Sequence, residues 1–85
     1  MNAPTLAIGE YSVLFAEHST GHIVKKDLTL YKNDCPTEQV FSRFKDLESA
    51  KTFVKEIMKE NVTLECVLYD FKGAYYQTYF PDNPL

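Results

Sequence analysis

The chain has 85 residues, of which 45% are hydrophobic, and a formal net charge of −3 at pH 7. This length allows one domain with one hydrophobic core, and the hydrophobic fraction argues against an intrinsically disordered chain. Twelve acidic residues against nine basic ones disfavour nucleic-acid binding and membrane-surface binding, because both depend on a basic excess. No signal peptide and no membrane-spanning apolar run is visible, so we expect one cytoplasmic domain over residues 1–85.

Two cysteines are too few for a disulfide scaffold and lack the paired Cys/His spacing of a zinc site. Cys66 lies in an alternating apolar run, which predicts a buried thiol. Cys35 precedes Pro36 and is expected on a loop. We interpret them as two unrelated free thiols in a reducing compartment.

The first predicted elements form a β-hairpin. A strand is expected from Ile8 to Ala16, and Gly21 in the following polar stretch supplies the positive φ of a turn. The second strand is expected from His22 to Tyr31, with apolar and polar residues alternating. Asn33-Asp34-Cys35-Pro36 then breaks the pattern.

A short third strand is expected from Glu38 to Phe44. Whether its Val40–Phe44 segment is a true strand stays open. The strongest pattern follows, an amphipathic helix from Leu47 to Glu60 with Asp46 as its N-cap and Asn61 as a left-handed residue at its end. Its predicted buried stripe is Leu47, Ala50, Phe53, Val54, Ile57 and Met58.

Two further strands, Val62 to Tyr69 and Ala74 to Phe80, are expected to form a second hairpin around Gly73. The fold class is therefore α+β: an antiparallel sheet of four to five strands with one amphipathic helix on one face, in the order β-β-β-α-β-β. We expect order over about residues 6–80 and loose tails at 1–5 and 81–85. The order of the strands in the sheet stays open.

No catalytic, cofactor-binding or metal-binding constellation is predicted. His18 and His22 flank the first turn, but a metal would need two further ligands and only Glu17 is near in sequence. The acidic residues are spread over turns and the solvent face of the helix, and neither cysteine has a histidine close to it in sequence. We therefore expect no enzyme activity, no cofactor and no metal.

Tyrosine is the one feature that asks for a functional explanation, because four of the six cluster in the last hairpin. A three-residue turn, Phe71 to Gly73, pairs Leu68 with Tyr76 and Cys66 with Thr78. Tyr76, Thr78 and Phe80 then face the helix, although the opposite assignment, with Tyr76 and Phe80 toward solvent, stays open. The candidate interaction surface on the face away from the helix is Val67, Tyr69, Tyr75, Gln77 and Tyr79.

An exposed tyrosine-rich face is typical of protein-interaction surfaces. The function expected from the sequence is a non-enzymatic module that binds another protein, or a second copy of itself, through this face. The alternatives are a single-stranded nucleic-acid binder that stacks bases on the sheet aromatics, which the net negative charge disfavours, and a structural homodimer. A further interpretation is that the tyrosines have no binding function and only form cross-strand pairs that stabilise the sheet.

Overall fold

The computed structural model describes residues 4–31 and 36–81. The expectations for Cys35 and for the outermost tail residues, 1–3 and 82–85, lie outside the described residues. The predicted α+β class, with one helix on an antiparallel sheet in the order β-β-β-α-β-β, is confirmed. The elements are β1 (Tyr11–Glu17), β2 (Ile23–Val24), the short 3-10 helix η1 (Thr37–Gln39), β3 (Phe41–Phe44), α1 (Leu47–Glu60), β4 (Leu64–Tyr69) and β5 (Tyr75–Tyr79).

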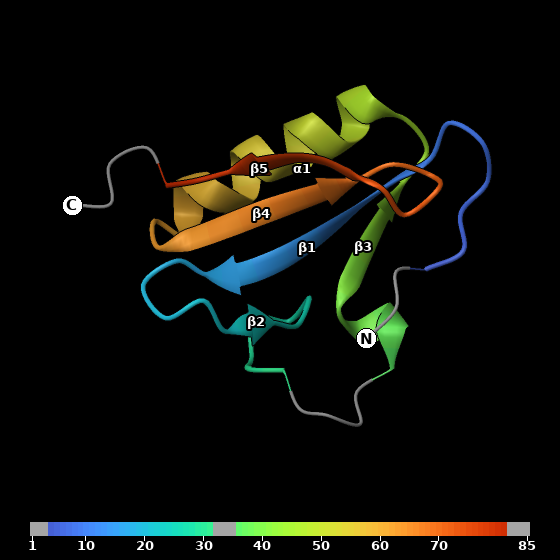
Figure 1. Cartoon of the computed structure of the whole chain (residues 1–85). Coiled ribbons are helices and arrows are strands. Elements are labelled where there is room, and N and C mark those ends of the chain that lie inside the picture. The colour runs from blue at the N-terminus through green and yellow to red at the C-terminus, as the bar shows by residue number, and fades with distance from the viewer. Residues whose placement is uncertain (1–3, 32–35, 82–85) are drawn as a thin grey trace.

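Strand β1 is the centre of the sheet (Figure 1). One of its edges pairs with β4 over nearly its whole length, from Ser12 opposite Tyr69 to Glu17 opposite Leu64. The other edge is shared, because β3 pairs with its first half and β2 with its last residues. All pairings are antiparallel, and β5 completes the order β2-β1-β4-β5.

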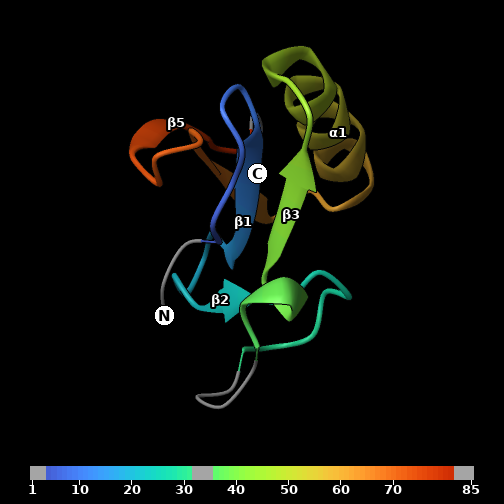
Figure 2. The same cartoon turned by 90° about the vertical axis from the view of Figure 1, so that its right-hand side faces the viewer.

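Helix α1 begins and ends where the sequence predicts and covers one face of the sheet (Figure 2). The Asp46 side chain accepts a hydrogen bond of 2.8 Å from the Ser49 backbone N–H, which confirms it as the N-cap. At the other end, Asn61 has φ −129° and ψ 81°, so the predicted left-handed conformation is wrong. Its side-chain Nδ2 donates to the Ile57 carbonyl at 2.8 Å, and no left-handed turn is needed to satisfy that group.

The main core lies between α1 and the sheet, where the predicted apolar stripe of the helix packs. Val13 and Phe15 alternate toward the helix along β1, and Leu64, Cys66 and Leu68 do so along β4. The buried members of this core are Val13, Phe15, Val24, Ala50, Val54, Leu64, Cys66 and Leu68.

The predicted second strand is wrong over most of its length, since only Ile23–Val24 pair as β2. Asp27 Oδ1 accepts from the backbone N–H and the hydroxyl of Thr29, at 3.0 and 2.6 Å, and Leu28 adopts a φ of 70°. These local hydrogen bonds hold a tight turn that the alternating pattern concealed. Leu30 then returns to form an isolated bridge with Val24.

Three other strands begin more than one residue later than predicted, whereas the end of β1 and both ends of β5 differ from the prediction by a single residue. Strand β1 begins at Tyr11 rather than Ile8, because Gly9 has a φ of 89° and the Glu10 N–H donates back to the Ala7 carbonyl. Strand β3 begins only at Phe41, after η1. Strand β4 begins at Leu64, since the Leu64 N–H donates to the Asn61 carbonyl in a turn.

Candidate functional site

The β4–β5 turn forms as the sequence predicts. Asp70 Oδ1 accepts hydrogen bonds from the backbone N–H groups of Lys72 and Ala74, at 2.9 and 3.0 Å. Gly73 has a φ of 78°, which a residue with a Cβ rarely adopts. Beyond the turn, Tyr69 lies opposite Tyr75.

One residue further along the hairpin, the predicted register fails. Leu68 lies opposite Gln77, so Tyr76 is an extra residue in β5 and forms a β-bulge. The predicted pairings of Leu68 with Tyr76 and of Cys66 with Thr78 are therefore wrong. The Tyr76 ring packs edge-on against the ring of Tyr11, with centroids 5.6 Å apart. Because side chains alternate with a period of two, this extra residue exchanges the two faces of β5 from here onward.

The bulge divides the five candidate residues between two surfaces. Tyr79 lies opposite Cys66 and packs against the main core, and Gln77 lies opposite Leu68, so their predicted placement away from the helix is wrong. Tyr75 lies opposite Tyr69 and is 63% exposed. Val67 and Tyr69 pack with Leu14 and Phe41 on the face opposite α1, which we call the open face.

Thr78 and Phe80 also belong to the open face, although the sequence predicted that they face the helix. Thr78 lies opposite Val67, and the Phe80 ring lies 5.7 Å from the ring of His18. Phe80 is 56% exposed. Both residues were assigned to the wrong face for the same reason, because the bulge at Tyr76 shifts the register of β5. Nothing in the local sequence indicates this bulge.

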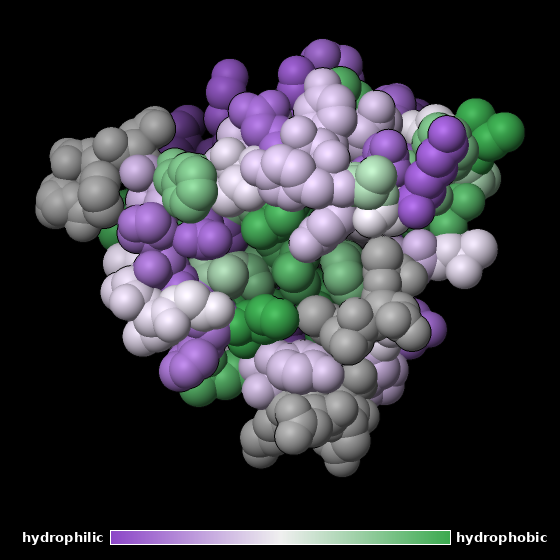
Figure 3. All heavy atoms as spheres, viewed as in Figure 1, coloured by the Kyte–Doolittle hydropathy of each residue, from purple (hydrophilic) through white to green (hydrophobic). Residues whose placement is uncertain are grey.

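The open face is not bare along its whole width. Val40 and Phe41, from the η1–β3 segment, are buried together with Leu14 and form a second, smaller core. The ring of Phe41 meets that of Tyr69 at 5.9 Å with an interplanar angle of 67°. Figure 3 views the open face and shows hydrophobic residues gathered at its centre over β1 and β4, bordered by hydrophilic ones. The part nearest β5 carries the exposed aromatic rings.

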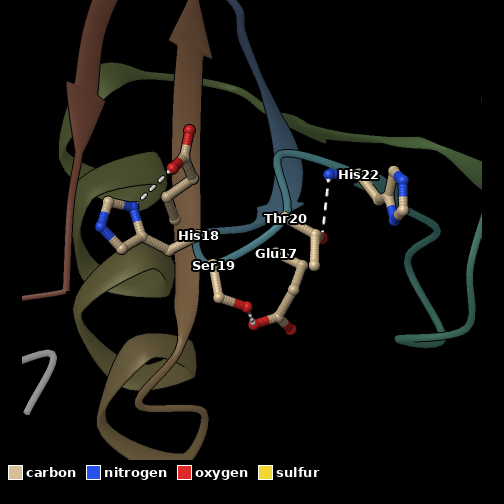
Figure 4. A network of polar contacts seen from close by, with 6 residues as sticks. Glu17, His18, Ser19, Thr20 and His22 are labelled. Carbon is tan, nitrogen blue, oxygen red and sulfur yellow. Dashed lines mark hydrogen bonds and ion pairs between the residues drawn. The ribbon is translucent and has the colours of Figure 1, made fainter.

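A histidine–carboxylate pair borders one end of the open face. Glu65, opposite Ala16, accepts a hydrogen bond of 2.9 Å at Oε1 from His18 Nδ1, because a carboxylate oxygen only accepts. The His18 backbone N–H donates to the Thr63 carbonyl at 2.9 Å, which ties the first turn to the start of β4. Figure 4 shows the His22 side chain on the far side of this turn, directed away from His18. Within residues 4–31 and 36–81, no group of three or more His, Cys, Asp or Glu residues has a metal-binding arrangement.

A second ion pair borders the opposite end. Arg43 lies opposite Ser12, and its Nη2 donates to Glu10 Oε1 at 3.2 Å. The backbone N–H of Ala7 donates to the same oxygen, and this bond together with the Arg43 guanidinium lowers the pKa of Glu10. Ser12 is fully buried, and its hydroxyl has no hydrogen-bond partner among the residues that the structure describes. The two ion pairs thus lie at opposite ends of the open face.

Cys66 lies beneath the helix, as the sequence predicts, and offers no reactive thiolate. Burial, followed by the charge of neighbouring Glu65, raises the pKa of its thiol to about 12. A thiol with this pKa is protonated at neutral pH and is a poor nucleophile.

No protein-family model matches the chain, and no curated protein or solved structure matches it either. None of the described segments forms a helix long and apolar enough to cross a membrane. The indications of function come from the chemistry and shape of the molecule's own surfaces.

Proposed function

We propose that this protein is a non-enzymatic interaction module that binds another protein through its open face. The observation that carries the proposal is the set of aromatic rings on the β4–β5 part of that face. Tyr75 and Phe80 are more than half exposed there, beside half-buried Tyr69. Tyrosine and other aromatic side chains that remain exposed next to an apolar surface are typical anchors of protein interfaces.

The arrangement of charge on this face supports a protein partner over a nucleic acid. Glu65 and Glu10 place carboxylates at its two ends, and Arg43 is already paired with Glu10. A phosphate backbone would meet these carboxylates and find little free positive charge. An apolar centre with polar groups at its margin is the usual plan of a protein–protein interface.

The proposal is tested with the double variant Tyr75→Ser, Phe80→Ser. The matched control is Ile8→Ser, which removes an apolar side chain that is 87% exposed in the loop before β1. Wild type and both variants are immobilised at equal loading, exposed to an extract of the cells that make the protein, and the retained proteins are quantified by mass spectrometry. Each candidate partner is then purified and titrated against all three proteins.

A true partner binds wild type and Ile8→Ser equally and binds the double variant about tenfold or more weakly. Thermal unfolding of the double variant stays close to that of wild type, because both side chains are largely exposed. Sedimentation velocity on the purified protein shows whether the partner is a second copy. Equal retention of every partner by the double variant would overturn the proposal, as would the absence of any partner together with a monomer up to about 1 mM.

A further inference from the structure

Strand β5 forms one margin of the sheet. It pairs with β4 alone among the described strands, so alternate residues direct their backbone N–H and C=O groups outward. Natural proteins usually protect such an edge with charged residues or proline within the strand. Tyr75–Tyr79 contains neither, and Pro81 follows only after the strand has ended. A β-bulge also protects an edge, but the bulge at Tyr76 lies near the start of β5 and leaves Gln77–Tyr79 regularly paired with β4. This margin is therefore chemically able to pair with another strand.

A groove of about 1080 Å³ runs between this strand and the helix. Gln77 and Tyr79, the two residues that the bulge turned away from the open face, line it from β5. Met58 and Val62 contribute apolar surface from α1 and from the turn after it. Residues of both β5 and α1 line this groove, which therefore lies beside the margin of the strand.

The helix wall of the groove carries Lys51, Lys55 and Lys59. All three are exposed, and none forms an ion pair with a described residue. Glu48 and Glu56 also line the groove. Both glutamates line a second hollow on the β3 side of the helix as well, whereas the three lysines line the groove and not that hollow. The lining of the groove thus carries three lysines against two glutamates, with the lysines at a regular spacing of four residues, while β5 itself carries no charge.

The spacing of these lysines matches that of side chains on a strand. Residues four apart on a helix are separated by about 6 Å along its axis. Side chains on one face of a strand recur every ~6.6 Å. Suppose that an extended segment pairs with the β5 margin and carries carboxylates at three alternate positions. Because the two spacings are nearly equal, each carboxylate then lies close to one of the three lysine amines of the helix.

We propose that this groove binds an extended acidic segment of a partner protein, which adds to the sheet as a further strand beside β5. The segment carries Asp or Glu at alternate positions, and these face Lys51, Lys55 and Lys59. Its backbone supplies the hydrogen bonds to β5, and the lysines select for charge. The groove lies on the helix side of the sheet, opposite the open face. Of the residues assigned to the open face, Phe80 also lines the groove, at the end of β5.

The probe is a fluorescein-labelled peptide, Ser-Glu-Val-Glu-Val-Glu-Ser, and fluorescence anisotropy at about 50 mM salt measures its binding. The control peptide, Ser-Glu-Glu-Glu-Val-Val-Ser, has the same charge and composition but cannot place its three carboxylates on one face of a strand. The protein variant is Lys51→Gln, Lys55→Gln, Lys59→Gln. Its matched control, Lys25→Gln, Lys26→Gln, Lys45→Gln, removes the same charge outside the groove.

The alternating peptide is expected to bind wild type and the control variant alike, and the groove variant about tenfold or more weakly. The control peptide binds more weakly than the alternating one to wild type. Amide hydrogen exchange read by NMR slows at alternate residues of Tyr75–Tyr79 when the peptide is bound, which charge attraction alone does not produce.

Three results would each overturn the inference. One is no binding of the alternating peptide up to about 1 mM. Another is an equal loss of affinity in the two lysine variants, which indicates non-specific attraction. The third is unchanged exchange of the β5 amides in the bound state, which shows that no strand has been added.

Discussion

The ring of Phe15, in the middle of β1, stacks on the ring of Phe53 on α1, with centroids 5.8 Å apart and planes 22° from parallel. The same Phe53 ring contacts Phe44 of β3 at 4.8 Å. Phe53 therefore joins the helix to two strands of the sheet, although it is itself only half-buried. Phe15 is 1% exposed.

We predict that Phe53→Ala lowers the free energy of unfolding by about 3 kcal/mol, near the lower end for aromatic core truncations because the ring is only half-buried. In a double-mutant cycle of Phe15→Leu with Phe53→Leu, measured by urea unfolding, the coupling between the rings should be about 0.5–1.5 kcal/mol. Glu60→Ala, at an exposed position of the same helix, should change stability by less than about 0.5 kcal/mol. Strictly additive effects of the two leucine substitutions would contradict the stacked contact.

The bulge at Tyr76 predicts different effects of truncating two tyrosines of the same strand. Tyr79 packs against the main core, whereas Tyr75 is 63% exposed. Tyr79→Ala should therefore reduce the free energy of unfolding by about 2 kcal/mol more than Tyr75→Ala. Chemical denaturation of the two variants measures the difference, and equal losses would show that the register is not the bulged one.

The buried thiol of Cys66 predicts how stability changes in alkali. Because burial raises its pKa from 9.0 to about 12, the folded state holds this proton more tightly than the unfolded state. Its contribution to stability is complete below pH 9 and is lost as the pH rises from about 9 to about 12. Denaturation at a series of pH values should show a steeper alkaline fall in wild type than in Cys66→Ala. Parallel curves for the two proteins would rule out this linkage.

The cap of α1 predicts the opposite dependence in acid. The hydrogen bonds from the Ser49 backbone and side chain lower the pKa of Asp46, so the folded state holds this proton less tightly than the unfolded state. The stability that this carboxylate contributes is present above its ordinary pKa and is lost as the pH falls below about 4. Asp46→Asn keeps a capping oxygen without the charge, and its acid unfolding curve should be shallower than that of wild type. Identical slopes would show that the cap does not titrate in this range.

The buried hydroxyl of Ser12, beneath the open face, leads to a prediction about stability. This hydroxyl has no partner among the described residues, and a buried polar group without a hydrogen bond destabilises the folded state. Ser12→Ala removes that group at almost constant volume, so we expect a stability equal to wild type or up to about 1–3 kcal/mol higher. Thermal and urea unfolding both report the change. A clear loss of stability would mean that the hydroxyl finds a partner, such as an ordered water.

The elements that the sequence predicted well are those whose causes are local. The cap at Asp46 and the apolar stripe of α1 lie within a few turns of one helix, and Gly73 and Asp70 lie within one turn. Local hydrogen bonding also explains the failed second strand, because Asp27 and Thr29 hold a turn inside an alternating pattern.

The errors in the candidate site have causes that are distant in the chain. The extra residue Tyr76 packs on Tyr11, which belongs to another strand. The second core depends on β3 pairing with β1, which brings Phe41 opposite Leu14. Neither contact is visible in the hairpin itself, so alternation alone assigned Gln77 and Tyr79 to the wrong face.

The central position of β1 also matters while the chain is being made. Its long edge is completed only by β4, and the contact between His18 and Glu65 spans 47 residues of sequence. At a translation rate of ~5–20 residues per second, roughly 2–10 s pass before those partner residues are synthesised. During this interval the apolar run Val13–Ala16 emerges from the ribosome without its β4 partner. The long edge of β1 thus stays uncovered for several seconds of synthesis, until the residues of β4 are made.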